Sequence, residues 1–445
     1  MTTEEQTAEN SVDLDYALAA AIRLHQSGQL DQAEALYQAI LEAFPQCPEA
    51  LHFFGLLRHQ QGDSDAAIRL IEQALVEAPQ YSDAYNNLGN IYNKLEQFEH
   101  AAEAYGKALD LNPDNAAAYS NFGIVLGHLL RFEEAVEAFT MAVSIMPENS
   151  EFYRNLGNVF KKQGDFAKSA AAYRKVLCLK PYQSDNYENL CLMLYLLGHV
   201  EEAILLIKQW LELDPENPLA LHRWAAYTGE LSQTRASDDY IRQTFDAFSD
   251  SFDMVLKRLE YKAPFLVADA VKEIYQVTGQ ALTILDAGCG TGLCGPLLKP
   301  YAKQIVGVDL SAKMLEKAEK RDCYDELIAS ELTAFIQAHP ASYDVIVSAD
   351  TLVYFGDLSD VAKAAAAALL PGGHLIFTVE RSEQPLAQGY AIHPHGRFSH
   401  TEDYLRRVIN SAGLTIKKLD RVMLRYEVDA QVDGFLLVAG YDSNR

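Results

Sequence analysis

The sequence predicts an α-solenoid followed by an α/β domain with a mostly parallel sheet, and two observations carry this prediction. Six prolines recur at a fixed spacing of 34 residues, namely Pro45, Pro79, Pro113, Pro147, Pro181 and Pro215. A fixed period of roughly 20 to 50 residues is typical of stacked structural repeats. From about residue 265 the pattern changes to short apolar strands that alternate with helices, which indicates a second fold.

The repeated half carries small and large residues in register with the prolines. One column is small (Ala33, Ala67, Ala101, Ala135, Ser169, Ala203), a second is glycine (Gly55, Gly89, Gly123, Gly157) and a third is bulky (Tyr37, Ile71, Tyr105, Phe139, Tyr173, Ile207). Small residues let two helices approach closely, and proline ends the second helix of each pair. The period and columns resemble those of tetratricopeptide repeats, which bind other polypeptides in a concave groove.

A further column consists of asparagines, two residues before the glycines: Asn87, Asn121, Asn155 and Asn189. A side-chain amide donates and accepts hydrogen bonds, so a row of them can hold a peptide backbone of any sequence. The column resembles the asparagine ladder of O-linked N-acetylglucosamine transferases, which favours a peptide or protein as the partner. Hydrogen bonding between neighbouring helices of the stack is the alternative explanation.

Composition excludes several classes of partner. The formal net charge is −25, so the chain repels nucleic-acid phosphates and anionic membrane surfaces. The six cysteines include no CxxC pair, the N-terminus is polar, and no apolar run is long enough to span a bilayer. We therefore expect a cytoplasmic protein without nucleic-acid or membrane partners.

The second half opens with a strand, a glycine-rich turn and a helix. The strand Thr283–Asp286 runs into Gly288, Gly290 and Gly292, and the next strand ends in Asp309. Glycines let a cofactor approach the backbone, and a carboxylate at the next strand end can accept ribose hydroxyls. Gly290, Gly292 and Gly295 also spell GxGxxG, but the acid that closes the first strand and the lack of a second nucleotide-binding half disfavour a dinucleotide fold.

Residues 236–441 resemble the class I S-adenosylmethionine (SAM)-dependent methyltransferases, and the segment 240–264 resembles a bacterial family of predicted repeat-containing methyltransferases. The landmarks are the glycine turn, strands near 327–332, 343–350 and 375–379, the turn Leu369–Gly373, and two final strands near 414–425 and 433–441. The resemblance implies a seven-stranded sheet with an antiparallel C-terminal hairpin, and SAM as cofactor. It assigns the cofactor to Asp286, Gly288, Gly290, Gly292, Asp309, Leu310, Glu331, Leu332, Ala349, Phe252 and Tyr261.

The acceptor side of these folds lies after the fourth strand and before the sixth. There we expect Asp350, Tyr390, Arg397 and His400 to bind substrate. A methyl acceptor that must lose a proton needs a base, for which the candidates are His393, His395 and Tyr354. The histidines and Glu380 also suggest a metal site, but hydrogen bonding is the commoner role of such a group, so no metal is expected.

Two classes of methyltransferase are disfavoured by missing motifs. The chain has Asp350-Thr-Leu-Val where amino-directed nucleic-acid methylases carry Asn/Asp-Pro-Pro-Tyr, and it has no Pro-Cys dipeptide for cytosine C5 chemistry. Three functions stay open. The first is a SAM-dependent methyltransferase whose repeats bind a peptide or protein as methyl acceptor. The second is a small-molecule carboxylate or hydroxyl methyltransferase whose repeats dock a partner or form a homodimer. The third is a SAM-binding scaffold without turnover.

The predicted organisation has three parts. Residues 1–12 form a disordered tail, and residues 13–233 form six repeats followed by a capping helix that begins at Pro218. Residues 234–445 form the methyltransferase domain, whose first part, 234–280, is a helical lid rich in aromatic residues.

Overall fold

The computed structural model describes residues 3–182, 184–230, 234–275, 281–427 and 430–442. The chain divides into two compact units, Met1–Ala203 and Ile204–Arg445. The division falls within α12, earlier than the boundary at residue 233 that the sequence predicts. The predicted capping helix α13 (Pro218–Thr228) belongs to the second unit, because its side chains hydrogen-bond to the backbone of Pro394 and Gly396 in that unit.

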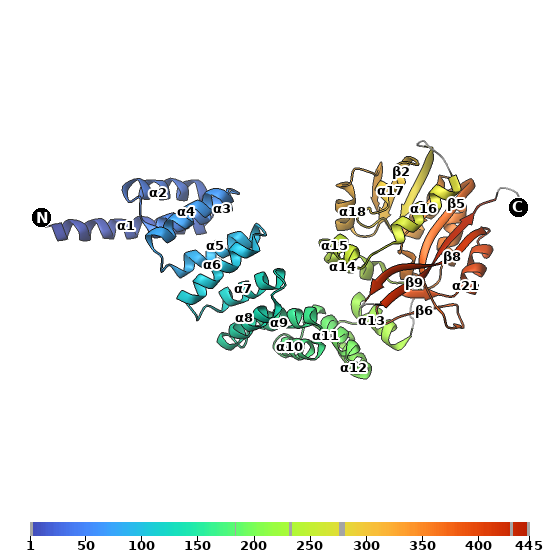
Figure 1. The fold of residues 1–445 in the computed structure, drawn as a ribbon, viewed down its shortest axis with the longest axis horizontal. Coiled ribbons are helices and arrows are strands. Elements are labelled where there is room, and N and C mark those ends of the chain that lie inside the picture. Colours follow the sequence, from blue (N-terminus) through green and yellow to red (C-terminus); the bar gives the residue numbers. More distant parts are fainter. Residues whose placement is uncertain (1–2, 183, 231–233, 276–280, 428–429, 443–445) are drawn as a thin grey trace. The chain divides into compact units, whose positions relative to one another are not determined.

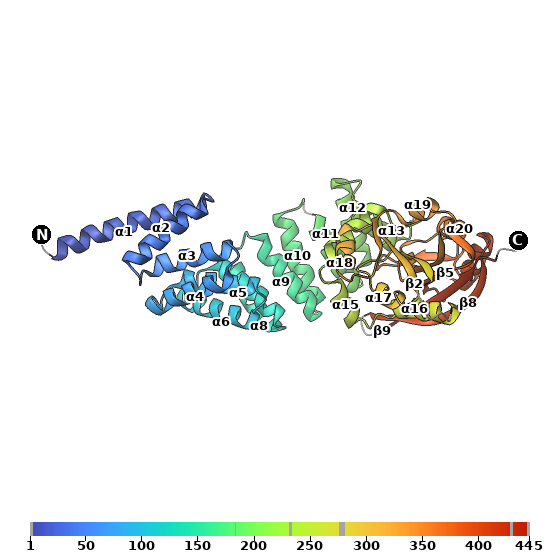
Figure 2. The same cartoon turned by 90° about the horizontal axis from the view of Figure 1, so that it is seen from above.

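The first unit is a stack of antiparallel helix pairs, as the 34-residue period predicts (Figure 1). Five complete pairs, α1–α2 to α9–α10, and helix α11 lie in this unit, while α12 continues into the second unit from Ile204 on. Each pair corresponds to one repeat, and the proline column follows the second helix of each repeat. The helices are α1 (Thr3–Gln26), α2 (Leu30–Ala43), α3 (Pro48–Gln60), α4 (Ser64–Glu77), α5 (Ser82–Lys94), α6 (Phe98–Leu111), α7 (Ala116–His128), α8 (Phe132–Ile145), α9 (Ser150–Gln163), α10 (Phe166–Leu179), α11 (Ser184–Leu196) and α12 (Val200–Leu213). Figure 2 shows the partners of the early pairs side by side.

The glycine column lets a large side chain of the second helix fit against the first. A Cβ atom at Gly123 on α7 would lie 2.8 Å from the ring of Phe139 on α8, and Gly89 meets Tyr105 in the same way. Phe139 and Tyr105 are fully buried. The glycine column and the bulky column therefore form one contact between the two helices of a repeat, and this contact recurs along the stack.

The first helix begins earlier than the sequence prediction allows. A disordered tail was expected through residue 12, whereas α1 already includes residues 3–12; residues 1 and 2 lie outside the described part. The segment Thr3–Gln26 contains no glycine or proline and several good helix formers, so nothing in it stops the helix of the first repeat from extending towards the N-terminus.

The second unit is built on a twisted sheet whose core runs β3–β2–β1–β4–β5, with parallel neighbours throughout. The last two strands form an antiparallel hairpin in which β9 pairs with β5, as predicted. The strands are β1 (Leu282–Ala287), β2 (Ala302–Asp309), β3 (Glu326–Ala329), β4 (Tyr343–Ser348), β5 (Leu369–Arg381), β6 (Tyr390–Ile392), β7 (Phe398–His400), β8 (Thr415–Glu427) and β9 (Ala430–Gly440).

Helices pack against both faces of the sheet and bury two hydrophobic clusters. They are α16 (Ala263–Tyr275), α17 (Gly295–Leu298), α18 (Ala312–Glu319), α19 (Leu332–Gln337), the 3₁₀ turn η1 (Leu352–Tyr354), α20 (Ser359–Ala368) and α21 (Glu402–Ser411). Ahead of them lie α14 (Asp238–Phe248) and α15 (Phe252–Arg258), where the lid is predicted. Strands β1, β4 and β5 read as nearly continuous apolar runs because both faces of a central parallel strand are covered.

The prediction of seven strands omits the short hairpin β6–β7. This hairpin extends the sheet at the end of β5, where Glu380 pairs with Ser399. Its turn is held by α13, which lies beside it (Figure 1). His222 on α13 hydrogen-bonds to the carbonyl of Gly396 at 2.7 Å and stacks on Tyr240 at 3.7 Å between ring centroids. No helix in the described part of the chain is long and apolar enough to cross a membrane.

Substituting Gly123 with alanine tests the helix contact of the repeats. The added methyl group would overlap the Phe139 ring, so we expect a loss of about 1–3 kcal/mol of stability from overpacking. Gly127 on the same helix is the matched control, since a Cβ there meets nothing within 4 Å and alanine favours the helix by about 1 kcal/mol. Thermal unfolding followed by circular dichroism measures both; equal midpoints for the two variants would contradict the contact.

Candidate functional site

One cavity of the α/β domain has a floor of bare backbone at the carboxyl ends of β1 and β2. The cavity has a volume of about 380 Å³ and is lined by Gly288, Gly290 and Asp309, among others. Gly288 has a φ of +80°, and a Cβ there would lie 2.2 Å from Thr351 Oγ1, so only glycine fits. At Gly290 a Cβ would meet only the Phe252 ring, at 3.9 Å, so this side of the turn is open to a ligand.

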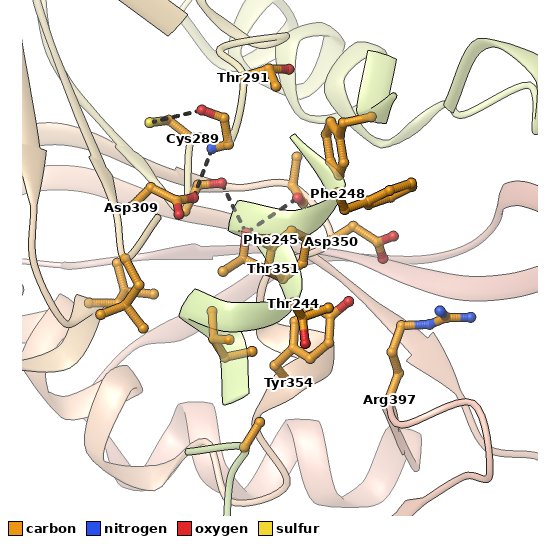
Figure 3. Close-up of a pocket in the computed structure, with 18 of the residues that line it drawn as sticks. Thr244, Phe245, Phe248, Cys289, Thr291, Asp309, Asp350, Thr351, Tyr354 and Arg397 are labelled. Carbon is orange, nitrogen blue, oxygen red and sulfur yellow. Dashed lines mark hydrogen bonds between the residues drawn. The ribbon is translucent and has the colours of Figure 1, made fainter. Parts of the chain in front are cut away.

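Asp309 closes the floor at the end of β2 (Figure 3). Its Oδ2 accepts the N–H of Gly290 at 2.9 Å and its Oδ1 accepts the N–H of Ser311 at 2.9 Å. Burial raises the pKa of this carboxyl group, while the backbone hydrogen bonds oppose the rise. Each oxygen keeps a second lone pair, so Asp309 can accept further hydrogen bonds from a ligand in the cavity.

Asp286 lies beneath the floor instead of lining it. The side chain is fully buried, and Oδ2 accepts a hydrogen bond from the Tyr324 hydroxyl at 2.7 Å. Burial raises the pKa of Asp286 to about 7, against the effect of the Tyr324 hydrogen bond. The Tyr324 ring in turn fills the space beside Gly292 and Gly295. Neither Asp286 nor Gly292 is among the residues that line the cavity, and Asp286 Oδ1 has no hydrogen-bond partner among the described residues, so the ligand contact expected of both stays a prediction.

Helices α14 and α15 cover the cavity with aromatic side chains. Phe245, Phe248 and Phe252 line it, and adjacent rings meet edge to face at 5.4 and 6.1 Å. Carboxylates on these helices bond to the glycine turn and to residues in or next to α18. Asp246 accepts from Ser311 Oγ at 2.5 Å, Asp250 from Lys317 Nζ at 2.7 Å and Asp253 from Thr291 Oγ1 at 2.5 Å. The two helices thus form a cover that is attached to the glycine turn and to α18.

A buried group of charged side chains forms the opposite wall. Its centre is Arg425 on β8, which is only 3% exposed and pairs with three carboxylates. Nη1 donates to Asp350, Nη2 to Glu380, and Nε to Glu427 at 2.7 Å. Arg397 adds a second cation, whose Nε donates to Glu380 and Nη2 to Glu427, both at 2.6 Å.

The two acids nearest Arg425 differ in their pKa. Burial opposes the ionisation of Glu380, but Arg397 and Arg425 together lower its pKa to about 2. Asp350 faces Arg425 from one side only, and burial raises its pKa above the ordinary value. Asp350 also has a φ of +59°, which is uncommon for a residue other than glycine. Its N–H donates to Thr378 Oγ1 at 2.8 Å, which helps to hold that backbone conformation.

The model of a methyltransferase domain matches residues 285–377, which include the glycine turn and the first part of β5. Two tetratricopeptide-repeat models match residues 82–115 and residues 18–82, 129–187 and 154–218. The chain therefore carries tetratricopeptide repeats and a methyltransferase domain.

Curated relatives of the methyltransferase domain include ubiquinone biosynthesis O-methyltransferases. The protein from Serratia proteamaculans (strain 568) is 30% identical over 105 residues, which cover 22% of this chain and 44% of the relative. The protein from Idiomarina loihiensis is 32% identical over 142 residues, which cover 28% of this chain and 58% of the relative. The chain thus spans about half the length of the curated relatives that it matches.

Solved structures similar to the chain include repeat proteins. The crystal structure of MamA is 24% identical and covers 36% of this chain and 94% of its own, with a TM-score of 0.35. The structure titled "YrrB: a TPR protein with an unusual peptide-binding site" is 20% identical and covers 42% of this chain and 96% of its own, with a TM-score of 0.38.

The cavity of the methyltransferase domain gathers most of the predicted site residues. Besides Gly288, Gly290 and Asp309, the predicted residues that line it are Leu310, Glu331, Leu332, Ala349, Phe252, Tyr261, Asp350, Tyr354, His395 and Arg397. Tyr261 donates to the Ala349 carbonyl at 3.3 Å, and Glu331 accepts the N–H of Ala334 at 2.7 Å. These contacts fix both side chains at the cavity wall.

Three residues predicted on the acceptor side lie away from the cavity. His393 sits 2.6 Å from Ser399 Oγ through Nε2, and Tyr390 packs against Gly356. His400 is fully buried, 3.0 Å from the Gly356 carbonyl, and burial lowers its pKa to about 4. The structure brings none of the three to the cavity because the β6–β7 hairpin turns them into its own packing.

His395 does reach the cavity, but its ring is already engaged. Nδ1 accepts the N–H of Arg397 at 3.3 Å, and Nε2 lies 3.5 Å from Glu380 Oε2. Desolvation and the nearby Arg397 lower the pKa of this histidine, which makes it a poor proton acceptor. Within the described part of the chain no group of three or more His, Cys, Asp or Glu residues is arranged to hold a metal ion.

The asparagine column lies in the repeat unit and bonds between repeats. Each amide meets a side chain of the preceding repeat, at 3.0 to 3.4 Å. The pairs are Asn87 with His52, Asn121 with Asn90, Asn155 with Ser120, and Asn189 with Lys161. Inter-repeat packing therefore uses part of each amide, and peptide binding by the column stays a prediction.

Sequence reasoning missed the residue at the centre of the charged wall. Arg425 lies in a strand that alternates in character, and Glu427 follows on the same face two residues later. The two-residue spacing is the one sequence signal that could have linked these two side chains. It does not distinguish a buried face of the strand from an exposed face. The cavity residues Arg223, Arg235, Thr244 and Thr351 were missed as well, because they come from segments far apart in the chain.

Replacing Arg425 with methionine tests the charged wall. The change leaves Asp350, Glu380 and Glu427 without their shared cation, so we expect a loss of about 3–5 kcal/mol in the free energy of unfolding. Arg421 on the same strand is exposed, and its change to methionine is the matched control, with an expected effect within about 0.5 kcal/mol. Urea unfolding followed by fluorescence compares them, and similar losses for both variants would refute the assignment.

Proposed function

We propose that the protein is a SAM-dependent methyltransferase that transfers the methyl group inside the cavity under α14 and α15. One observation carries the proposal: a glycine turn with room for a ligand and a half-buried carboxylate at the next strand end line the same cavity. These are the features that a nucleoside with a charged tail requires. The relatives among O-methyltransferases support the same chemistry.

The residues present fit this cofactor. Asp309 would accept the ribose hydroxyls, and the open backbone at Gly290 leaves room for the sugar. Leu310, Leu332 and Phe252 offer apolar surface to the adenine ring, and Glu331 has a buried oxygen, Oε1, without a hydrogen-bond partner among the described residues. When bound, SAM supplies an electrophilic methyl group on a positively charged sulfur.

The protein's own contribution is alignment and exclusion of water. Methyl transfer proceeds in line, so the nucleophile of the acceptor must be held against the methyl carbon. The phenylalanines of α14 and α15 close the cofactor side of the cavity, and the charged wall around Arg425 fixes the other side. A water-poor cavity strengthens the electrostatic interactions inside it.

We further propose that the repeats bind a peptide or protein, and that this guest carries the methyl acceptor. The support is the asparagine column, whose period matches that of the repeats. Asn121 and Asn155 are half-buried, and an amide has two donors and an acceptor with two lone pairs, so the one inter-repeat bond that each of them donates leaves capacity for a ligand.

A small-molecule hydroxyl acceptor is the second candidate. The names of the O-methyltransferase relatives favour it. In that case the repeats would dock a partner or a second copy of the chain.

Substituting Asp309 tests cofactor binding. Asp309→Ala should weaken SAM binding by about 100-fold or more, because a buried acceptor of charge-assisted hydrogen bonds is worth roughly 3 kcal/mol. Isothermal titration calorimetry measures the affinity. Asp309→Asn keeps the size and one carbonyl, and serves as the folding-competent variant; exposed Asp360→Ala is the control. Normal affinity in Asp309→Ala would remove the basis of the cofactor assignment.

Changing the four column asparagines to alanine tests peptide delivery. With radiolabelled SAM and host lysate, label in the protein fraction should fall about tenfold or more, because four hydrogen bonds of roughly 0.5–1.5 kcal/mol are lost. SAM affinity should stay unchanged, and exposed Asn112→Ala is the control. Unchanged transfer to protein would contradict delivery by the column. Transfer only to small molecules would favour the second candidate, and SAM binding without any transfer would favour a scaffold.

A further inference from the structure

Polar groups with unused hydrogen-bonding capacity meet at the charged wall of the cavity, around Asp350. Asp350 Oδ1 is shielded from solvent and has no hydrogen-bond partner among the described residues, although Oδ2 is paired with Arg425. No hydrogen bond to the Tyr354 hydroxyl is found among the described residues, and this side chain lines the cavity as well. Figure 3 shows the polar ends of Asp350, Tyr354 and Arg397 around one side of the pocket.

The three groups have complementary roles towards a ligand. An ionised Asp350 only accepts hydrogen bonds, whereas Arg397 only donates and Tyr354 can donate. The guanidinium of Arg397 uses Nε and Nη2 on Glu380 and Glu427, and its Nη1 has no hydrogen bond within the described part of the structure. A ligand group that both donates one hydrogen bond and accepts others would satisfy all three.

The charges of the wall discriminate between classes of acceptor. Asp350, Glu380 and Glu427 carry three negative charges against the two positive charges of Arg397 and Arg425. A carboxylate acceptor would therefore be placed beside an excess of negative charge. An amine would be drawn to Asp350 but would make no use of the donors on Tyr354 and Arg397. A neutral hydroxyl group uses both kinds of partner.

We propose that the methyl acceptor is a hydroxyl group, which Tyr354 and Arg397 hold by its oxygen and Asp350 by its proton. In the reaction the hydroxyl oxygen forms a bond to the methyl carbon while the carbon–sulfur bond breaks, and its electron pair stays on the sulfur. The proton of the hydroxyl passes to Asp350 and from there to water. The products are a methyl ether and the neutral thioether. This inference rests on the proposed SAM-dependent methyl transfer.

The surroundings of Asp350 suit it for this role. Burial raises its pKa, and a stronger base takes up a proton more readily at neutral pH. The backbone of Asp350 is in the left-handed region, a conformation that is often found at functional sites. The charged or titratable groups that face it are Arg425 and Glu427 from β8, Glu380 from β5, Arg397 from the β6–β7 turn, Tyr261 ahead of α16 and Tyr354 from η1.

The chemical form of the transferred label tests the acceptor class. The full-length protein is incubated with methyl-labelled SAM and host lysate, and the protein and small-molecule fractions are separated. Label that resists mild alkali and is released as labelled methyl iodide by hot hydriodic acid identifies an ether, as expected. Release of labelled methanol by mild alkali would identify an ester, and label that stays on the amino acid or amine through both treatments would identify a methylated nitrogen; either result overturns the proposal. Label in protein places the hydroxyl on a side chain, and label in the other fraction places it on a small molecule.

Two variants, assayed with the lysate fraction that becomes labelled, test the roles assigned to Asp350 and Tyr354. Asp350→Asn should lower the transfer rate by about 10²–10⁴-fold with SAM affinity within twofold of wild type. The wild-type rate should rise with pH as Asp350 loses its proton, and the variant should lose this rise. Tyr354→Phe keeps the ring and should lower the rate by about 10²-fold, as loss of one positioned donor does. Asp344→Asn, at the other end of β4, is the control, since Asp344 bonds to the N–H of Thr283.

The outcomes separate this inference from the proposed function. An Asp350→Asn variant with wild-type rate and pH profile, or a Tyr354→Phe variant with wild-type rate, overturns the assigned roles while methyl transfer stands. A wild-type protein that binds SAM and labels neither fraction refutes the proposed function itself, and the acceptor assignment falls with it.

Discussion

The methyltransferase domain depends on one buried cation. Arg425 joins the ends of three segments that are distant in sequence: Asp350 after β4, Glu380 at the end of β5, and Glu427 at the end of its own strand. A buried guanidinium is costly to desolvate, and here it is paired with three carboxylates, so removing the cation would leave buried negative charge uncompensated. The arrangement fixes the wall of the cavity, because Asp350, Glu380 and Glu427 are all bonded to this one side chain.

The charged wall and the glycine turn both line the cavity, and each is held in place in a different way. The turn relies on the absence of side chains, since Gly288 meets Thr351 and any Cβ would collide. The wall is held by ion pairs of Arg397 and Arg425 with three carboxylates. Within it, Asp350 Oδ1 has no hydrogen-bond partner among the described residues. Unpaired polar atoms are costly in a folded interior, so they are retained where a ligand completes them. The position of Oδ1 is the reason to place the chemistry at this wall.

The β6–β7 turn connects this wall to the segment that follows the repeats. Arg397 and His395 come from the turn, and the neighbouring Gly396 carbonyl is held by His222 on α13. Burial lowers the pKa of His222 to about 4, which keeps the ring neutral and stacked on Tyr240. The helix that the sequence assigns to the repeats as a cap therefore contributes to the geometry of the cavity.

The sequence alone determined the repeats, the parallel sheet with its C-terminal antiparallel hairpin, and the glycine turn followed by Asp309 at the end of the next strand. Local rules govern each of these: the 34-residue columns specify a contact between adjacent helices, and the glycine turn with Asp309 lies within two consecutive strands. It did not determine the charged wall, the packing role of His393 and His400, or where α13 docks. Those depend on contacts between segments far apart in the chain, such as Arg425 with Asp350 and His222 with Gly396. The periodicity and spacing of a sequence do not predict which distant residue will neutralise a buried charge. Only the tertiary structure therefore decided the charged wall, the packing of the two histidines and the position of α13.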